Sequence, residues 1–108
     1  MKSWFGAVTL GLWMVSASWA GRPLAPVELR DHHGQPHQVP DVEKAPLTVI
    51  AFLGGECPLA KQYAVRLVEL QKEYASKGVS FVAVDANVQD SLSEMVAFVK
   101  TYGLTFPF

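Results

Sequence analysis

The sequence predicts an α/β fold in which a short N-terminal β-hairpin precedes a β-α-β-α unit with a central parallel sheet. Residues 47–53 and 79–84 form two apolar runs rich in β-branched residues, as expected for strands that are covered on both faces. Between these runs, apolar side chains recur at helical spacing from Leu59 onward. Upstream, residues 27–30 alternate apolar and polar side chains, which is the period of a half-buried strand.

Turn signals separate these segments. Residues 31–35 contain Asp and Gly and predict a turn, and residues 38–39 follow as a short return strand. The glycine pair at 54–55 ends the first apolar strand, Pro58 is typical of a first helical residue, and Gly78 marks the end of that helix. A strand, a helix and a second strand in this order imply a right-handed crossover and parallel pairing.

A second helix is predicted after the second apolar strand. Residues 91–94 read Ser-Leu-Ser-Glu, which is a capping-box pattern. Apolar residues between Leu92 and Tyr102 then form a helical stripe that ends at Gly103. Residues 104–108 resemble the approach to another strand. Because sheet edges and apolar helix faces are normally covered, we expect the chain to be truncated or completed by another chain.

The first 20 residues predict a signal peptide. Lys2 supplies a positive charge, an apolar run follows, and small residues at Ser18 and Ala20 end it, so we expect cleavage after Ala20. The apolar run is short for a membrane span, and no stable span is expected after cleavage. The alternative is an uncleaved N-terminal anchor. In either case residues 21–108 are expected to be exported, to the periplasm or the outer face of the inner membrane.

Charge and cysteine content exclude several classes of protein. Nine Lys and Arg residues stand against ten Asp and Glu residues, and no basic stripe is present, which disfavours nucleic-acid binding. The single cysteine, Cys57, rules out an internal disulfide. An odd cysteine in an exported protein is a reactive thiol, half of an intermolecular bond, or a buried inert residue.

The position of Cys57 favours a reactive thiol. At a strand-to-helix junction, the free N–H groups and the positive end of the helix macrodipole stabilise a thiolate. Lys61 lies one turn later and adds positive charge, whereas Glu56 opposes it in part. The glycine pair at 54–55 removes side-chain bulk, which would let the backbone of a partner approach the sulfur. The candidate catalytic residues are Cys57, Pro58 and Lys61.

Residues 48–61 read Thr-Val-Ile-Ala-Phe-Leu-Gly-Gly-Glu-Cys-Pro-Leu-Ala-Lys and resemble the active-site region of the thioredoxin-like superfamily. They are most similar to its redoxin branch, the alkyl hydroperoxide reductase and thiol-specific antioxidant family. The hairpin, the strand at 81–84 and residues 103–107 fit the same pattern, so residues 21–108 are identified as a thioredoxin-like (redoxin) domain. The resemblance implies that the C-terminal strands and the final helix are missing, because complete members continue with a strand preceded by a cis-proline, a last strand and a last helix.

Supporting residues of the superfamily are replaced in this chain. Thioredoxins carry a second cysteine three residues after the first, and Ala60 stands there. Ala51 replaces their buried carboxylate, and Glu56 replaces their tryptophan. Peroxiredoxins place Thr or Ser three residues before the cysteine and Pro seven before it, where this chain has Gly54 and Ile50. Their later Arg has no identified counterpart.

Three histidines provide a second candidate site. His32, His33 and His37 lie in or near the predicted hairpin turn, and imidazole together with a thiolate such as Cys57 suits copper or zinc. Copper-delivery proteins of this fold use two cysteines and a distant histidine, whereas this chain has one cysteine. Solvated histidines are the simpler interpretation of a polar turn, so no metal and no other cofactor is predicted.

Three functional hypotheses follow. The leading one is an exported redoxin domain with thiol-dependent oxidoreductase or peroxidase-like antioxidant activity, in which Cys57 is the nucleophile and an external partner supplies the resolving thiol. Its partners would be a thiol or disulfide protein, or a peroxide. The second hypothesis is a non-catalytic binding or scaffold module that keeps the fold without the chemistry. The third is a copper-handling module.

Overall fold

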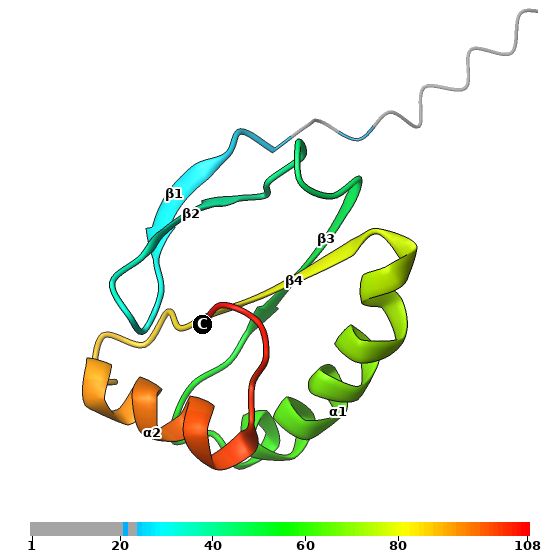
Figure 1. Cartoon of the computed structure of the whole chain (residues 1–108). Helices are drawn as coiled ribbons and strands as arrows, with labels where there is room; N and C mark the ends of the chain where they lie inside the picture. The colour runs from blue at the N-terminus through cyan, green and yellow to red at the C-terminus, as the bar shows by residue number, and fades with distance from the viewer. Residues whose placement is uncertain (1–20, 22–23) are drawn as a thin grey trace, which may run out of the picture.

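The computed structural model describes Gly21 and residues 24–108, so the predicted signal peptide lies outside the described residues. Strands, helices and one 3-10 turn follow one another along the chain (Figure 1). In order they are β1 (Val27–Arg30), β2 (Pro36–Val39), β3 (Leu47–Phe52), α1 (Pro58–Tyr74), η1 (Ala75–Lys77), β4 (Val79–Val84) and α2 (Leu92–Tyr102). The predicted order of elements is therefore confirmed.

The strands pair as two separate sheets. β1 and β2 form an antiparallel hairpin in which Val27 lies opposite Val39. β3 and β4 are parallel, in register from Leu47 opposite Val79 to Phe52 opposite Val84. The predicted hairpin and parallel pair are both present, but the hairpin does not extend the parallel sheet.

Glycines end the 3-10 turn η1 and the helix α2, whereas α1 itself ends at Tyr74. After α1 the chain tightens into η1, and Gly78 then adopts φ 79°. Gly103 ends α2 at φ 64°. Both values lie in the left-handed region, which glycine occupies without steric cost. These two glycines therefore end the helical conformation and let the chain turn toward the next segment. At its start, α2 carries the predicted capping box between Ser91 and Glu94.

The core joins α1, β4, α2 and the C-terminal segment. Phe81 and Ala83 point from β4 into this core, whereas the residues between and after them are only half-buried, as strand alternation requires. Aromatic rings from three elements meet there: Phe81 packs on Phe106 with ring centroids 6.0 Å apart, and Phe98 packs on Phe108 at 5.5 Å. The buried core residues are Leu53, Ala60, Ala64, Val68, Phe81, Ala83, Phe98, Leu104, Phe106 and Phe108.

Residues 104–108 return from α2 to lie beside β4 (Figure 1). The N–H of Ala83 donates to the carbonyl of Pro107 at 2.9 Å, and the N–H of His32 donates to the backbone oxygen of Phe108 at 2.8 Å. This segment therefore links the edge of β4 to the hairpin turn, and residues 104–108 themselves form no strand.

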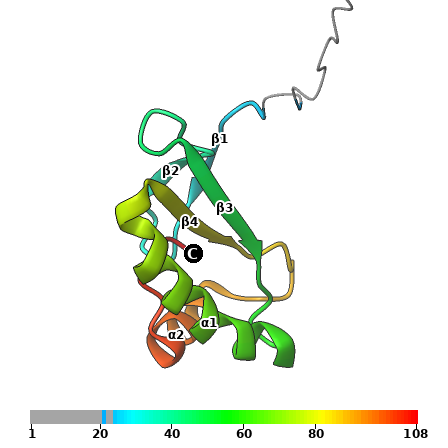
Figure 2. The same ribbon diagram turned by 90° about the vertical axis from the view of Figure 1, so that its right-hand side faces the viewer.

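β3 is more exposed than its sequence predicts. An apolar run of this kind is typical of a strand covered on both faces, yet Phe52 is 72% exposed and Leu47 59%. The reason is its place in the sheet: within the part of the chain that the structure describes, β3 pairs with β4 alone. Figure 2 shows β3 on the side of β4 that faces away from the C-terminus of the chain.

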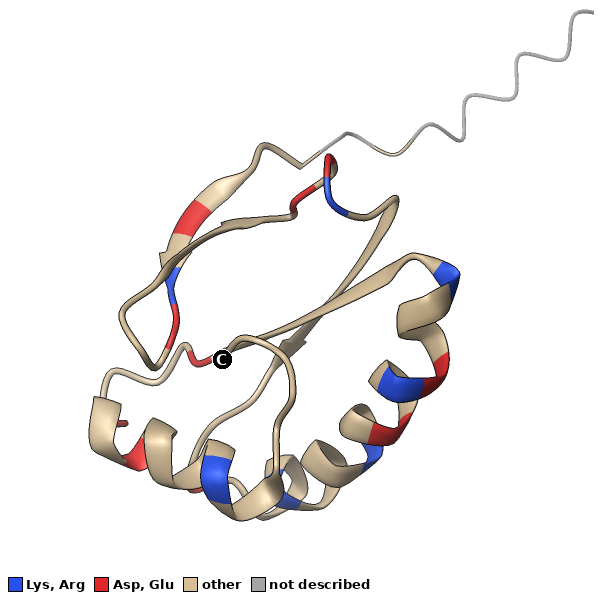
Figure 3. Ribbon diagram, viewed as in Figure 1, with Lys and Arg blue, Asp and Glu red and all other residues tan. Residues whose placement is uncertain are grey.

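Charge follows the solvent-facing parts of the fold. β3 and β4 carry no charged residue, whereas Lys, Arg and Glu recur along α1 (Figure 3). Among residues 21 and 24–108, no helix has the length and apolar character needed to cross a membrane.

Helix α1 offers a direct test of the core. Ala64 is completely buried, whereas its neighbour Val65 is 50% exposed. Ala64→Leu should lower the free energy of unfolding by about 1–3 kcal/mol, because the added atoms have no space. Val65→Leu is the matched control and should change it by less than about 0.5 kcal/mol. Urea unfolding followed by circular dichroism measures both, and equal effects would contradict this packing.

Candidate functional site

The turn between β3 and α1 holds Cys57. Parallel pairing continues one residue past β3, where the N–H of Leu53 donates to the carbonyl of Val84 at 3.0 Å. The chain then closes a tight turn, in which the N–H of Cys57 donates to the carbonyl of Gly54 at 3.1 Å. Cys57 is the N-cap of α1, in extended conformation, and Pro58 is the first helical residue.

The thiol of Cys57 lies free at the helix start. The residue is exposed, and its side chain makes no capping hydrogen bond. Its carbonyl accepts the N–H of Lys61 at 3.1 Å, which is the first α-helical bond of α1. Pro58 has no N–H, so the unsatisfied amide hydrogens of this helix end belong to Leu59 and Ala60. The arrangement can therefore support negative charge at the sulfur.

Lys61 is directed toward Glu56. Its Nζ lies 4.0 Å from Glu56 Oε2, an ion pair at an exposed surface. Lys61 and Glu56 line a hollow against α2 that also includes Phe98 and Tyr102, whereas Cys57 lines a different groove. The charged side chains that flank Cys57 in the sequence thus pair with each other, so their charges partly cancel.

The groove beside Cys57 is apolar. It has a volume of about 380 Å³ and runs between the end of β3 and the first turns of α1. Three large side chains on it are strongly exposed: Phe52 at 72%, Leu59 at 61% and Tyr63 at 60%. An exposed thiol beside an apolar groove could react with a partner that buries apolar surface there.

The positions that the superfamily uses for helper groups also border this groove. Ala60, which stands where thioredoxins have a second cysteine, is 6% exposed and faces the core. Ala51, at the position of the buried carboxylate, packs against the same core. Among the residues that the structure describes, Cys57 is the only thiol.

The glycine pair has a role that the sequence did not indicate. Gly54 and Gly55 face the loop after β4, and the N–H of Gly55 donates to Asp90 Oδ2 at 2.7 Å. The expectation that these glycines leave room for the backbone of a partner is therefore replaced by contact with Asn87 and Asp90. The topology could have indicated this, because parallel strands end at the same edge of a sheet and their following loops meet there.

Two carboxyl groups in that loop titrate differently. Burial raises the pKa of Asp85, the N–H of Asn87 lowers it in part, and the nearby Asp90 carboxylate raises it again. The hydrogen bond from Gly55, followed by that from the Asn87 side chain, lowers the pKa of Asp90. Asp90 is therefore the more acidic member of the pair.

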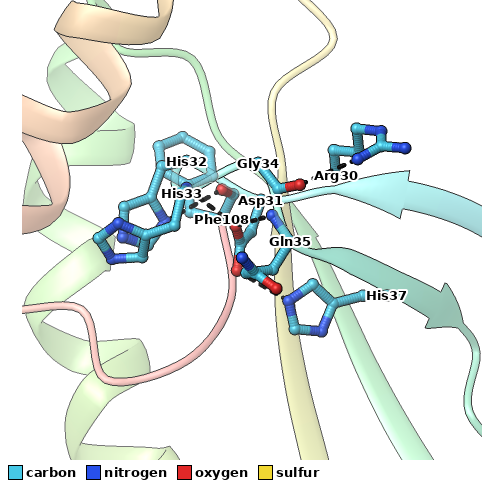
Figure 4. A network of polar contacts seen from close by, with 8 residues as sticks. All are labelled: Arg30, Asp31, His32, His33, Gly34, Gln35, His37 and Phe108. Atoms are coloured by element: carbon cyan, nitrogen blue, oxygen red, sulfur yellow. Dashed lines mark hydrogen bonds and ion pairs between the residues drawn. The ribbon is translucent and has the colours of Figure 1, made fainter.

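The histidines lie in a separate network at the hairpin turn, which Figure 4 shows. His37 Nε2 lies 2.8 Å from Asp31 Oδ2, and Asp31 Oδ1 accepts the N–H groups of His33 and Gln35 at 2.8 and 2.9 Å. His32 Nδ1 lies 3.4 Å from the backbone oxygen of Phe108. Burial acts to raise the pKa of Asp31, but the hydrogen bonds from His37, Gln35 and His33 outweigh it and lower the pKa to about 2.

This network does not reach Cys57. Over residues 21 and 24–108, no group of three or more His, Cys, Asp and Glu side chains is arranged to hold a metal ion. His37 instead pairs with the carboxylate of Asp31 through its Nε2.

Comparison with known proteins identifies relatives of this fold. Residues 20–108 match the model of the AhpC/TSA family. No curated protein sequence matches the chain. An uncharacterized conserved protein from Geobacillus kaustophilus is similar in structure, with TM-score 0.70, 34% identity, and coverage of 81% of this chain and 49% of that protein.

Two further solved structures are similar in fold. A thiol:disulfide interchange protein of the thioredoxin family from Chlorobium tepidum has TM-score 0.68, 24% identity, and coverage of 79% of this chain and 57% of that one. A secreted disulfide oxidoreductase from Mycobacterium tuberculosis has TM-score 0.63, 22% identity, and coverage of 75% and 57%. The predicted thioredoxin-like fold is confirmed, and the chain spans about half the length of these structures.

The Asp31 network predicts an acid-dependent contribution to stability. Because the pKa of Asp31 falls from 3.8 to about 2 on folding, its contribution is complete above about pH 5 and is lost as the pH falls toward 2. The difference in unfolding free energy between the natural chain and Asp31→Ala should shrink as the pH falls from about 5 to about 2. Urea titrations at each pH measure it, and a difference that grows in acid would contradict this interpretation.

Proposed function

The chain belongs to the AhpC/TSA family, and on this premise we propose that it is an exported thiol-dependent redox domain whose nucleophile is Cys57. The observation that carries the proposal is the free, exposed thiol at the N-cap of α1. Pro58 fixes the first helical residue behind it without adding an amide hydrogen. The thiol is therefore accessible at the N-terminal, positive end of the helix macrodipole.

The proposed reaction is thiol–disulfide exchange. The Cys57 thiolate attacks one sulfur of a partner disulfide, one S–S bond forms between the two proteins, and the partner's other sulfur leaves as a thiolate. Ala60 supplies no second thiol, so the mixed disulfide persists until an external thiol attacks it and releases Cys57. The partner is thus a thiol or disulfide protein that docks beside the groove.

A peroxide is the alternative oxidant. Attack of the thiolate on a peroxide breaks the O–O bond and gives Cys57 sulfenic acid, and the leaving oxygen takes a proton from solvent to give an alcohol or water. An external thiol then condenses with the sulfenic acid and releases water, and a second thiol reduces the resulting mixed disulfide to return the Cys57 thiol. The family supports this route, whereas Gly54 lacks the hydroxyl that would orient the peroxide. Thiol–disulfide exchange is therefore the reaction that we favour.

Export is part of the proposal. It is supported by the signal-peptide pattern of residues 1–20, and residues 21–108 would then form the redoxin domain outside the cytoplasm. An oxidising compartment contains the disulfide partners that the reaction needs. A relative of the same fold is described as secreted.

The non-catalytic binding module is the competing proposal, and the exposed apolar groove favours it. The two proposals differ at Cys57. If the chain is a binding module, the Cys57→Ser variant should still bind its partner. If it is a redox domain, this variant should no longer exchange disulfides with the partner.

The first test measures the reaction of Cys57 with a small disulfide, such as glutathione disulfide, at pH 7. We expect one equivalent of mixed disulfide per chain, stable until an external thiol is added, because the chain has one cysteine. The matched control is a peptide of residues 52–61, which has the same local sequence without the fold. The folded chain should react about threefold or more faster. A rate equal to that of the peptide would remove the redox proposal.

A second test separates the neighbouring charges. Lys61→Gln should slow the exchange about two- to threefold, because a positive charge one helical turn from the thiolate is lost, and Glu56→Gln should accelerate it by a similar factor. Stopped-flow measurements with a neutral disulfide at low salt give both rates. Changes in the same direction would show that these side chains do not act on Cys57 through charge.

A further inference from the structure

The loop after β4 is bound to the turn that carries Cys57. Gly55 lies two residues before the thiol, is buried, and donates its N–H to Asp90 Oδ2 at 2.7 Å across 35 positions of the sequence. Within the turn itself, the bond from the Cys57 N–H to Gly54 is longer, at 3.1 Å. The short contact to a carboxylate is thus the tertiary bond that fixes the turn, and hydrogen bonds to charged groups are the stronger class.

The loop is folded around the same carboxylate oxygen. Asn87 Nδ2 donates to Asp90 Oδ2 at 3.2 Å, and the N–H of Asp90 donates to the carbonyl of Asn87 at 3.3 Å. The N–H of Asn87 donates in turn to Asp85 Oδ1 at 2.8 Å. Asp85 Oδ2 is buried and, among the described residues, has no hydrogen-bond partner. Asp90 is therefore held in place by hydrogen bonds to Asn87 of the same loop.

The turn at residues 54–55 and the loop after β4 are in close contact. A Cβ atom at Gly54 would overlap the side-chain amide of Asn87, and one at Gly55 would lie 3.3 Å from Asp90 Oδ2. Residues 54 and 55 have ordinary negative or extended backbone angles, so the close approach, and not backbone conformation, accounts for glycine at both positions. The turn and the loop therefore fit each other closely, and a side chain at position 54 would displace the amide of Asn87.

We propose that Asp90 is a positioning residue for Cys57, which holds the thiol at the N-cap of α1 by fixing the N–H of Gly55. The proposal rests on the redox function proposed for Cys57. Asp90 acts through Gly55 and has no contact with the reacting atoms. Its lowered pKa agrees with a carboxylate that stays charged while it accepts these bonds.

Two variants of Asp90 test the proposal. Asp90→Ala removes the acceptor, so the amide of Gly55 should exchange with solvent about tenfold or more faster, and the rate of mixed-disulfide formation at Cys57 should fall about threefold or more. Asp90→Asn keeps one oxygen at this place. Because both bonds end on the single oxygen Oδ2, Asn can accept both and should restore most of the protection and most of the rate.

Asp41→Ala is the matched control. Asp41 Oδ1 accepts the N–H of Lys44 at 3.1 Å in a similar turn bond, far from Cys57 in the sequence. It should leave both readouts unchanged. Urea unfolding of every variant separates a local effect from a loss of global stability. Unchanged Gly55 exchange in Asp90→Ala, or faster exchange with an unchanged Cys57 rate, would overturn the proposal.

A second pair of variants keeps the test decisive if Asp90→Ala does not fold. Gly54→Ala should push the Asn87 amide away and slow the Cys57 reaction, and adding Asn87→Ala should restore the space and much of the rate. No recovery in the double variant would contradict the proposal. Failure of the redox function itself would look different, since the natural chain would then react no faster than the peptide of residues 52–61.

Discussion

The parallel pairing of β3 with β4 is the constraint on which the site depends. Parallel strands end at the same edge of their sheet, so the turn that carries Cys57 and the loop that carries Asp90 must meet. The pairing in turn requires the crossover helix α1, which packs on the core through Ala60, Ala64 and Val68. One topological feature thus sets the helix start, the position of the thiol and the contact beneath it.

This geometry separates two requirements of redox chemistry. The helix start carries the free thiol that we propose as the nucleophile, and the groove with Phe52, Leu59 and Tyr63 provides an apolar surface beside it. The second requirement, a resolving thiol, is not provided at Ala60, which is buried in the core. A chain with the first property and without the second forms mixed disulfides easily and depends on another molecule to release them.

The sequence predicted most of the fold because its local signals agree with one another. The glycines at 54–55 and 103, the proline at 58 and the Ser91–Glu94 capping box set element boundaries that the structure confirms to within a residue or two. The end predicted at Gly78 differs, because α1 stops at Tyr74 and the chain passes through η1 before it reaches that glycine. The prediction of burial was wrong for β3. Its apolar composition predicts a covered strand, but burial also depends on which strands lie beside it. The sequence-based prediction also missed Asp90, because a bond across 35 positions leaves no periodic signal. The sequence also did not predict that Lys61 pairs with Glu56, because either side chain could have turned toward the thiol.

The central claim is that folding makes Cys57 a better nucleophile than its local sequence would be alone. The most direct measurement follows the rate of mixed-disulfide formation with glutathione disulfide in the full chain across its urea unfolding transition, corrected for the effect of urea on a free thiol. The account predicts that the corrected rate falls in step with the loss of helix signal. A corrected rate that stays constant, or that rises as the chain unfolds, would contradict it.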